Sequence, residues 1–141
     1  MTHIFRSSAA KFICVAAGIF AIHAASSTLP AQSGGGKAEP RRVEFARGRS
    51  SAELIGTLAN AQEAEYIFTA RAGQTVTISL SPKGLFDHRV FDPETEFETE
   101  FDSTPSVSFK LPADGDYFLF VRKKITRVSK RARFRLILSI K

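Results

Sequence analysis

From residue 42 to the C-terminus, apolar and polar side chains alternate along the chain, and short turn sequences interrupt the alternation. In the segment 75–81, valine, isoleucine and leucine share one face, while threonines and serines share the other. The segment 133–141 repeats this pattern and departs from it only at Ile137. Successive side chains of a strand point to opposite faces, so both segments predict half-buried β-strands.

Six more segments have the composition of strands: 42–46, 51–58, 64–70, 88–91, 106–111 and 116–123. Glycine, proline and aspartate separate them, as in Pro112-Ala113-Asp114-Gly115, and these residues favour turns. No helical period follows Ile22. About eight strands separated by turns predict an all-β fold, a single antiparallel β-sandwich of jelly-roll type.

The apolar faces of these strands are expected to supply one core. The predicted core residues are Phe45, Leu54, Tyr66, Phe68, Val76, Ile78, Leu80, Phe109, Leu111, Tyr117, Leu119, Val121, Phe134, Leu136 and Leu138. The segment 116–123 also carries Phe118 and Phe120 on its second face. We therefore expect it to be a central strand that is covered on both sides.

The N-terminal residues have the pattern of a secretory signal peptide. Arg6 and Lys11 precede the apolar run 12–22, which is shorter than the roughly twenty residues that span a bilayer. We expect a signal peptide at 1–25, cleavage between 24 and 31, a flexible glycine-rich segment at 26–41 and a domain at 42–141. A buried N-terminal helix is the alternative.

Export has consequences for the mature protein. The only cysteine, Cys14, lies within the apolar run, so the mature domain has no disulfide and few soft metal ligands. We expect a periplasmic protein with no cofactor and no transmembrane segment. About a hundred residues with many phenylalanines can be held together by their core alone.

The order of several motifs resembles one family. Its carriers are Val43-Glu44-Phe45, Gly48 followed by Ser50-Ser51-Ala52, Gly56, Tyr66, Ala72-Gly73-Gln74, and Leu111-Pro112-Ala113 with Gly115 and Tyr117. In this order they resemble the periplasmic inhibitors of goose-type (g-type) lysozyme, within the bacterial pre-peptidase C-terminal-like β-sandwich group. The resemblance covers residues 42–141, and Asp114 stands where the family often has serine. It implies a binding protein that occludes the active-site cleft of a lysozyme and protects peptidoglycan.

The charge distribution points to a site near the C-terminus. The segment 122–141 holds nine basic residues and no acidic one. A loop with Arg127, Lys130 and Arg131 between two strands would present cations to a cleft whose working groups are carboxylates. Ser50 and Ser51, which follow Gly48, are candidate contacts on a neighbouring loop, or hydroxyls that stabilise a turn.

The basic segment leaves other interpretations open. It could be a solvated face that protects an edge strand, or a surface that binds anionic envelope components. A generic periplasmic sandwich that binds such components or carbohydrate is therefore the alternative to a lysozyme inhibitor. Export and the lack of aromatic residues among the cations argue against nucleic acid as a partner.

The acidic stretch 87–102 and His88 within it are the candidate residues for metal binding and catalysis. Carboxylates alternate from Glu94 to Glu100, which favours a solvated acidic strand over a calcium loop because the spacing of a calcium loop is absent. His88 is the only histidine after the predicted signal peptide, and we expect it at the surface or in a turn. Because the chain has no nucleophile motif, we expect no enzyme. Because the calcium-loop spacing is absent, we also expect no metal site.

Overall fold

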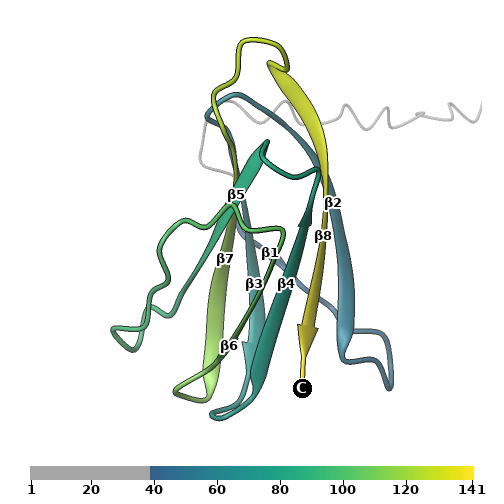
Figure 1. Cartoon of the computed structure of the whole chain (residues 1–141). Coiled ribbons are helices and arrows are strands. Elements are labelled where there is room, and N and C mark those ends of the chain that lie inside the picture. Colours follow the sequence, from purple (N-terminus) through teal and green to yellow (C-terminus); the bar gives the residue numbers. More distant parts are fainter. Residues whose placement is uncertain (1–38) are drawn as a thin grey trace, which may run out of the picture. The chain divides into compact units, whose positions relative to one another are not determined.

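The computed structural model describes residues 39–141, which form eight strands and no helix (Figure 1). The strands are β1 (Arg41–Arg42), β2 (Ser51–Ala59), β3 (Glu63–Ala70), β4 (Thr75–Ser81), β5 (Phe86–Phe91), β6 (Ser106–Lys110), β7 (Gly115–Lys123) and β8 (Arg131–Ile140). The predicted signal peptide and most of the glycine-rich segment lie outside the described residues.

The strands form two four-stranded sheets, with the orders β1-β3-β7-β5 and β2-β8-β4-β6. One hydrophobic cluster contains residues of both sheets, as the predicted β-sandwich requires. All strand pairs are antiparallel except β1 with β3, which is parallel. The prediction of an all-β, antiparallel sandwich is confirmed, and the two-residue strand β1 is the only one that pairs in parallel among the described strands.

The predicted strand 42–46 is mostly absent, since β1 contains only Arg41 and Arg42. The Val43 amide still donates to the Ile67 carbonyl at 2.7 Å, after which a turn closes with the Arg49 amide donating to the Ala46 carbonyl. Gly48 allows this turn because its φ of 74° is unfavourable for residues with a side chain.

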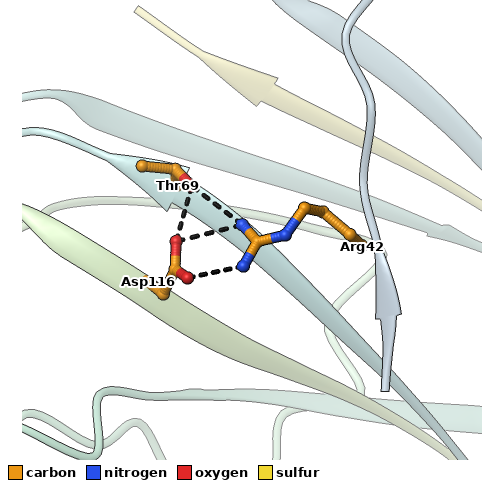
Figure 2. Close-up of polar contacts among 3 residues, drawn as sticks. All are labelled: Arg42, Thr69 and Asp116. Atoms are coloured by element: carbon orange, nitrogen blue, oxygen red, sulfur yellow. Dashed lines mark hydrogen bonds and ion pairs between the residues drawn. The ribbon is translucent and has the colours of Figure 1, made fainter. Parts of the chain in front are cut away.

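A polar cluster fastens β1 to its sheet (Figure 2). The Arg42 guanidinium donates to both carboxylate oxygens of Asp116 on β7, at 3.1 and 2.6 Å. Thr69 on β3 donates to the same carboxylate and accepts from Arg42. Side chains from three strands therefore fix the two-residue strand in place.

The core lies where the predicted apolar faces meet. Of the predicted core residues, Phe45, Leu54 and Phe109 are partly buried and all others are buried. Phe134 of β8 contacts Phe86 of β5 edge to face, with ring centroids 5.6 Å apart, and this contact joins the two sheets. A Cβ atom at Gly56 would lie 2.6 Å from the Phe134 ring, so the glycine provides room for that ring.

The prediction that the segment 116–123 is a central strand is confirmed, because β7 lies between β3 and β5. On its outer face Phe120 is only 9% exposed. The Arg89 guanidinium lies 4.8 Å from the centre of the Phe120 ring and 4.9 Å from that of Phe101. Phe101 comes from the segment that follows β5, so this segment covers part of the outer face.

The prediction of an acidic strand around Glu94–Glu100 is wrong. Residues 92–105 contain only isolated bridges, His88 with Asp102 and Phe91 with Glu98. Asp92 ends β5 by a turn, because its carboxylate accepts from the Glu94 amide and the Thr95 hydroxyl. The segment then runs along the edge of β5 without forming a regular strand.

Candidate functional site

The predicted basic loop joins β7 to β8 as residues 124–130, at the end of the sandwich opposite the C-terminus (Figure 1). Arg127 and Lys130 lie in the loop, and Arg131 is the first residue of β8. All three side chains are exposed. In the described part of the chain, none of the three forms an ion pair. The structure therefore brings the three predicted cations together at one end of the domain.

Ser50 and Ser51 lie at the other end of the sandwich. Ser51 at the start of β2 faces Ser139, whereas Ala59 at the end of β2 faces Arg131. At a rise of about 3.3 Å per residue, the eight steps from 51 to 59 separate the serines from the loop by about 26 Å. The expectation that these serines lie on a loop next to the basic loop is wrong.

The remaining basic residues of the segment 122–141 have other surroundings. Arg122 binds the Asp87 carboxylate through two hydrogen bonds, at 3.0 and 2.8 Å. Arg135 pairs with Glu53 across the outer face of the other sheet. Lys123 is completely buried. Three of the nine cations therefore have structural contacts, whereas Arg127, Lys130 and Arg131 form an exposed group at the loop.

Two aliphatic side chains in the same loop are further candidate site residues that the charge pattern did not indicate. Ile125 is 79% exposed and Val128 is fully exposed. Among the described residues, the only other large hydrophobic side chain with high exposure is Ile55, at 43%. The available signal was the presence of two aliphatic residues close together in a loop of basic residues, since exposed apolar surface rimmed by polar residues is typical of interaction sites.

The loop is held by hydrogen bonds to the turn between β2 and β3. The Asn60 amide donates to the Lys130 carbonyl at 2.8 Å, and its side-chain nitrogen donates to the Thr126 carbonyl at 2.8 Å. Within the loop, the Thr126 hydroxyl donates to the Ser129 carbonyl at 2.7 Å. These bonds fix the loop backbone, so its exposed side chains project from a defined base.

The motif around Asp114 serves the opposite end of the domain. The Asp114 carboxylate accepts a hydrogen bond from the Ala72 amide at 2.7 Å and so joins two neighbouring turns. The Tyr117 hydroxyl donates to the Ala113 carbonyl at 2.7 Å, while its ring is buried. These contacts give the motif a structural role in this chain.

His88 is buried on β5, with only 2% of its surface exposed, so the expectation of a surface or turn residue is wrong. Neither ring nitrogen has a hydrogen-bond partner among the described residues. Burial lowers the pKa of His88, and the nearby Asp102 and Asp87 carboxylates oppose this effect only in part. His88 thus lies in the core without a donor or acceptor that could activate it.

Two of the acidic residues after β5 have partners in the neighbouring structure. Glu98 pairs with Arg89, and Asp102 accepts from the Thr104 amide at 2.7 Å. Residues 39–141 contain no group of three or more histidine, aspartate or glutamate side chains placed to share a metal ion. In the same residues, no helix has the length and apolar character needed to cross a membrane.

Comparison with known proteins decides the family. No family model matches the chain. The chain is 32% identical over 108 residues to the inhibitor of g-type lysozyme from Escherichia coli (strain K12), covering 70% of this chain and 79% of that protein. The chain belongs to the family of g-type lysozyme inhibitors. These relatives inhibit an enzyme and are not enzymes themselves, in agreement with the expectation that this chain is not an enzyme.

Solved structures of the family agree with this assignment. A periplasmic inhibitor of g-type lysozyme from Salmonella Typhimurium is 29% identical, with a TM-score of 0.60, over 74% of this chain and all of that one. The corresponding inhibitor from Aeromonas hydrophila is 28% identical, also with a TM-score of 0.60, over 72% of this chain and 96% of that one.

A more distant likeness concerns the fold alone. The pre-peptidase C-terminal domain of a Bacillus anthracis collagenase is 16% identical, with a TM-score of 0.54, over 77% of this chain and all of that domain. This likeness confirms the β-sandwich fold that the resemblance to the wider group implied.

Proposed function

We propose that this protein is an exported, periplasmic inhibitor of a g-type lysozyme and that it acts by inserting the β7–β8 loop into the active-site cleft. The observation that carries the proposal is the composition of one rigid loop. It exposes Arg127, Lys130 and Arg131 together with Ile125 and Val128. By occluding the cleft, the protein would protect peptidoglycan from hydrolysis.

The chemistry of the loop suits such a cleft. Glycoside hydrolases work with carboxylates beside the scissile bond, and an arginine can bind a carboxylate through two parallel hydrogen bonds. The cations of the loop are exposed and unpaired within residues 39–141, so binding does not first have to break an internal ion pair. The aliphatic side chains add apolar surface that becomes buried only in the complex.

A second candidate function uses the same surface. Cations next to exposed aliphatic side chains are also typical of segments that bind the anionic surface of a lipid bilayer. In that case the loop would attach the protein to an envelope surface, and no cleft would be needed. Family membership favours the lysozyme, so envelope binding is the alternative.

Steady-state kinetics with a soluble oligosaccharide substrate test the proposal. Occlusion of the cleft predicts competitive inhibition of a g-type lysozyme, in which the apparent KM rises and kcat stays constant. The variant Arg127→Ala/Lys130→Ala/Arg131→Ala should lose this inhibition.

A matched variant, Arg47→Ala/Arg49→Ala/Arg71→Ala, removes three exposed cations at the opposite end and should inhibit like the wild type. Sedimentation with anionic phospholipid vesicles separates the two functions. Binding to vesicles without inhibition of the lysozyme would replace the proposal by the envelope function.

A further inference from the structure

Lys123 is an unusual residue for the interior of a small domain. It is the last residue of β7, and none of its surface is exposed. Its Nζ atom donates to the Lys124 carbonyl at 2.8 Å and to the Asn60 Oδ1 and Thr126 hydroxyl oxygens, both at 3.2 Å. Three acceptors match the three N–H groups of an ammonium ion.

All three acceptors are neutral. Among residues 39–141 Lys123 forms no ion pair, and the nearby Asp87 carboxylate is occupied by Arg122. A buried charge without a counterion costs free energy, and an apolar side chain of similar length would avoid that cost. Departures of this kind from favourable packing are expected at sites that serve function.

The acceptors lie where the loop needs support. Lys124 and Thr126 belong to the loop itself, and Asn60 belongs to the turn that holds the loop from the other side. The Thr126 amide also donates to Asn60 Oδ1, at 3.3 Å. One buried nitrogen atom therefore connects the core strand, the loop and the neighbouring turn.

We propose that Lys123 is the positioning residue of the β7–β8 loop: its buried ammonium group holds residues 124–126 against Asn60 and keeps the loop in the conformation that binds the partner. The role in binding rests on the proposed function. The neutral acceptors add a second effect, because no carboxylate cancels the charge of Lys123, and its field adds to that of the exposed cations above it.

The variant Lys123→Met tests the proposal, because it keeps the length and apolar stem of the side chain and removes the ammonium group. Amide hydrogen exchange of residues 125–129 should become at least tenfold faster. Thermal unfolding should occur within a few degrees of the wild-type temperature, because removal of the buried charge offsets the loss of its three hydrogen bonds. Inhibition of a g-type lysozyme should weaken at least tenfold. If Lys123 only stabilised the fold, the unfolding temperature would instead fall clearly, together with the faster exchange and the weaker inhibition.

A pair at position 126 provides a test that leaves the core unchanged. Thr126→Val is close in shape and lacks the hydroxyl, whereas Thr126→Ser retains it. The valine variant should show faster exchange and weaker inhibition, and the serine variant should behave like the wild type.

Unchanged exchange in the loop of folded Lys123→Met, or unchanged inhibition by it, would overturn the proposal. If the wild-type protein does not inhibit the lysozyme, the proposed function fails and with it the role of Lys123 in binding. Exchange is measured without lysozyme, so it decides separately whether Lys123 holds the loop.

Discussion

Arg42 binds both carboxylate oxygens of Asp116, so the shortest strand of the domain is fastened to the central strand of its sheet by one ion pair (Figure 2). The two residues are 74 positions apart in the chain. The arrangement has a measurable signature, because Arg42 and the Thr69 hydroxyl lower the pKa of Asp116 from 3.8 to about 2.

The pKa of Asp116 predicts how stability depends on acidity. A carboxylate with a lowered pKa in the folded state contributes stability that is present above pH 3.8 and is lost as the pH falls towards about 2. Both side chains are about half exposed, so the contribution is modest. Asp116→Asn should lower the unfolding temperature by a few degrees at neutral pH.

At the acidic end of this range the difference between Asp116→Asn and the wild type should disappear. Glu100→Gln, a similar change at an exposed residue, serves as the control and should have no effect on the unfolding temperature. An equal loss for Asp116→Asn at every pH would show that the ion pair is not the cause.

Gly56 gives a prediction about packing. A methyl group there would lie 2.6 Å from Cε1 and 2.8 Å from Cζ of Phe134, whose ring is fixed in the core. Gly56→Ala should therefore destabilise the domain by about 1–3 kcal/mol, measured by urea denaturation. When Phe134 is already replaced by leucine, Gly56→Ala should lower the free energy of unfolding by less than it does in the wild type, because the ring atoms that it would contact are absent. A neutral Gly56→Ala would contradict the close contact.

His88 predicts a second dependence on pH, at milder acidity. Burial lowers its pKa below the ordinary value of 6.5, so the unfolded chain binds a proton more readily than the folded protein does. The free energy of unfolding should therefore fall as the pH drops below about 6.5. His88→Leu removes the titrating group.

The difference in unfolding free energy between the wild type and His88→Leu should change between about pH 7.5 and 5. Asp102 and Asp87, the two carboxylates near His88, are present in both proteins. A difference that stays constant over this range would show that His88 has the same pKa in the folded and unfolded states.

The exposed aliphatic residues of the loop predict a loss of affinity without a loss of stability. Val128→Ser should weaken inhibition of a g-type lysozyme by roughly ten- to a hundredfold, because burial of one such side chain contributes about 1.5–3 kcal/mol. Its unfolding temperature should be unchanged, since the side chain has no core contacts to lose. Ile125→Ser should behave similarly.

Ile55→Ser is the matched control for these variants. Ile55 is 43% exposed on β2, away from the loop, so its replacement should leave inhibition intact. Full activity of both loop variants would exclude an apolar contribution from the loop.

Much of the fold could be predicted from local patterns. The alternation in 75–81 and 133–141 predicted β4 and β8 because a sheet with one buried face requires it. Alternation gave a wrong prediction at 94–100, where alternating glutamates suggested a strand. The turn made by Asp92 was the stronger signal. The parallel pairing of β1 and the burial of His88 depend on contacts between distant segments, so local patterns could not reveal them.

The site was predictable to a lesser degree. The run of cations indicated the loop with Arg127, Lys130 and Arg131 correctly as an exposed group. The expectation that Ser50 lies near this loop was wrong. Which loops meet at one end of the sandwich depends on the direction and pairing of the strands, and composition does not specify these. The contact between Lys123 and Asn60 joins residues 63 positions apart, and only the pairing of β7 with β3 brings them together.

We propose above that this protein blocks a g-type lysozyme with its basic loop. The most direct measurement is lysis of bacterial cell walls by goose-type and chicken-type lysozymes in the presence of increasing amounts of the protein. We predict inhibition of the goose-type enzyme, its loss in Arg127→Ala/Lys130→Ala/Arg131→Ala, and its retention in Ser50→Ala/Ser51→Ala. No inhibition of the goose-type enzyme by the folded protein, or equal inhibition by the loop variant, would contradict the account.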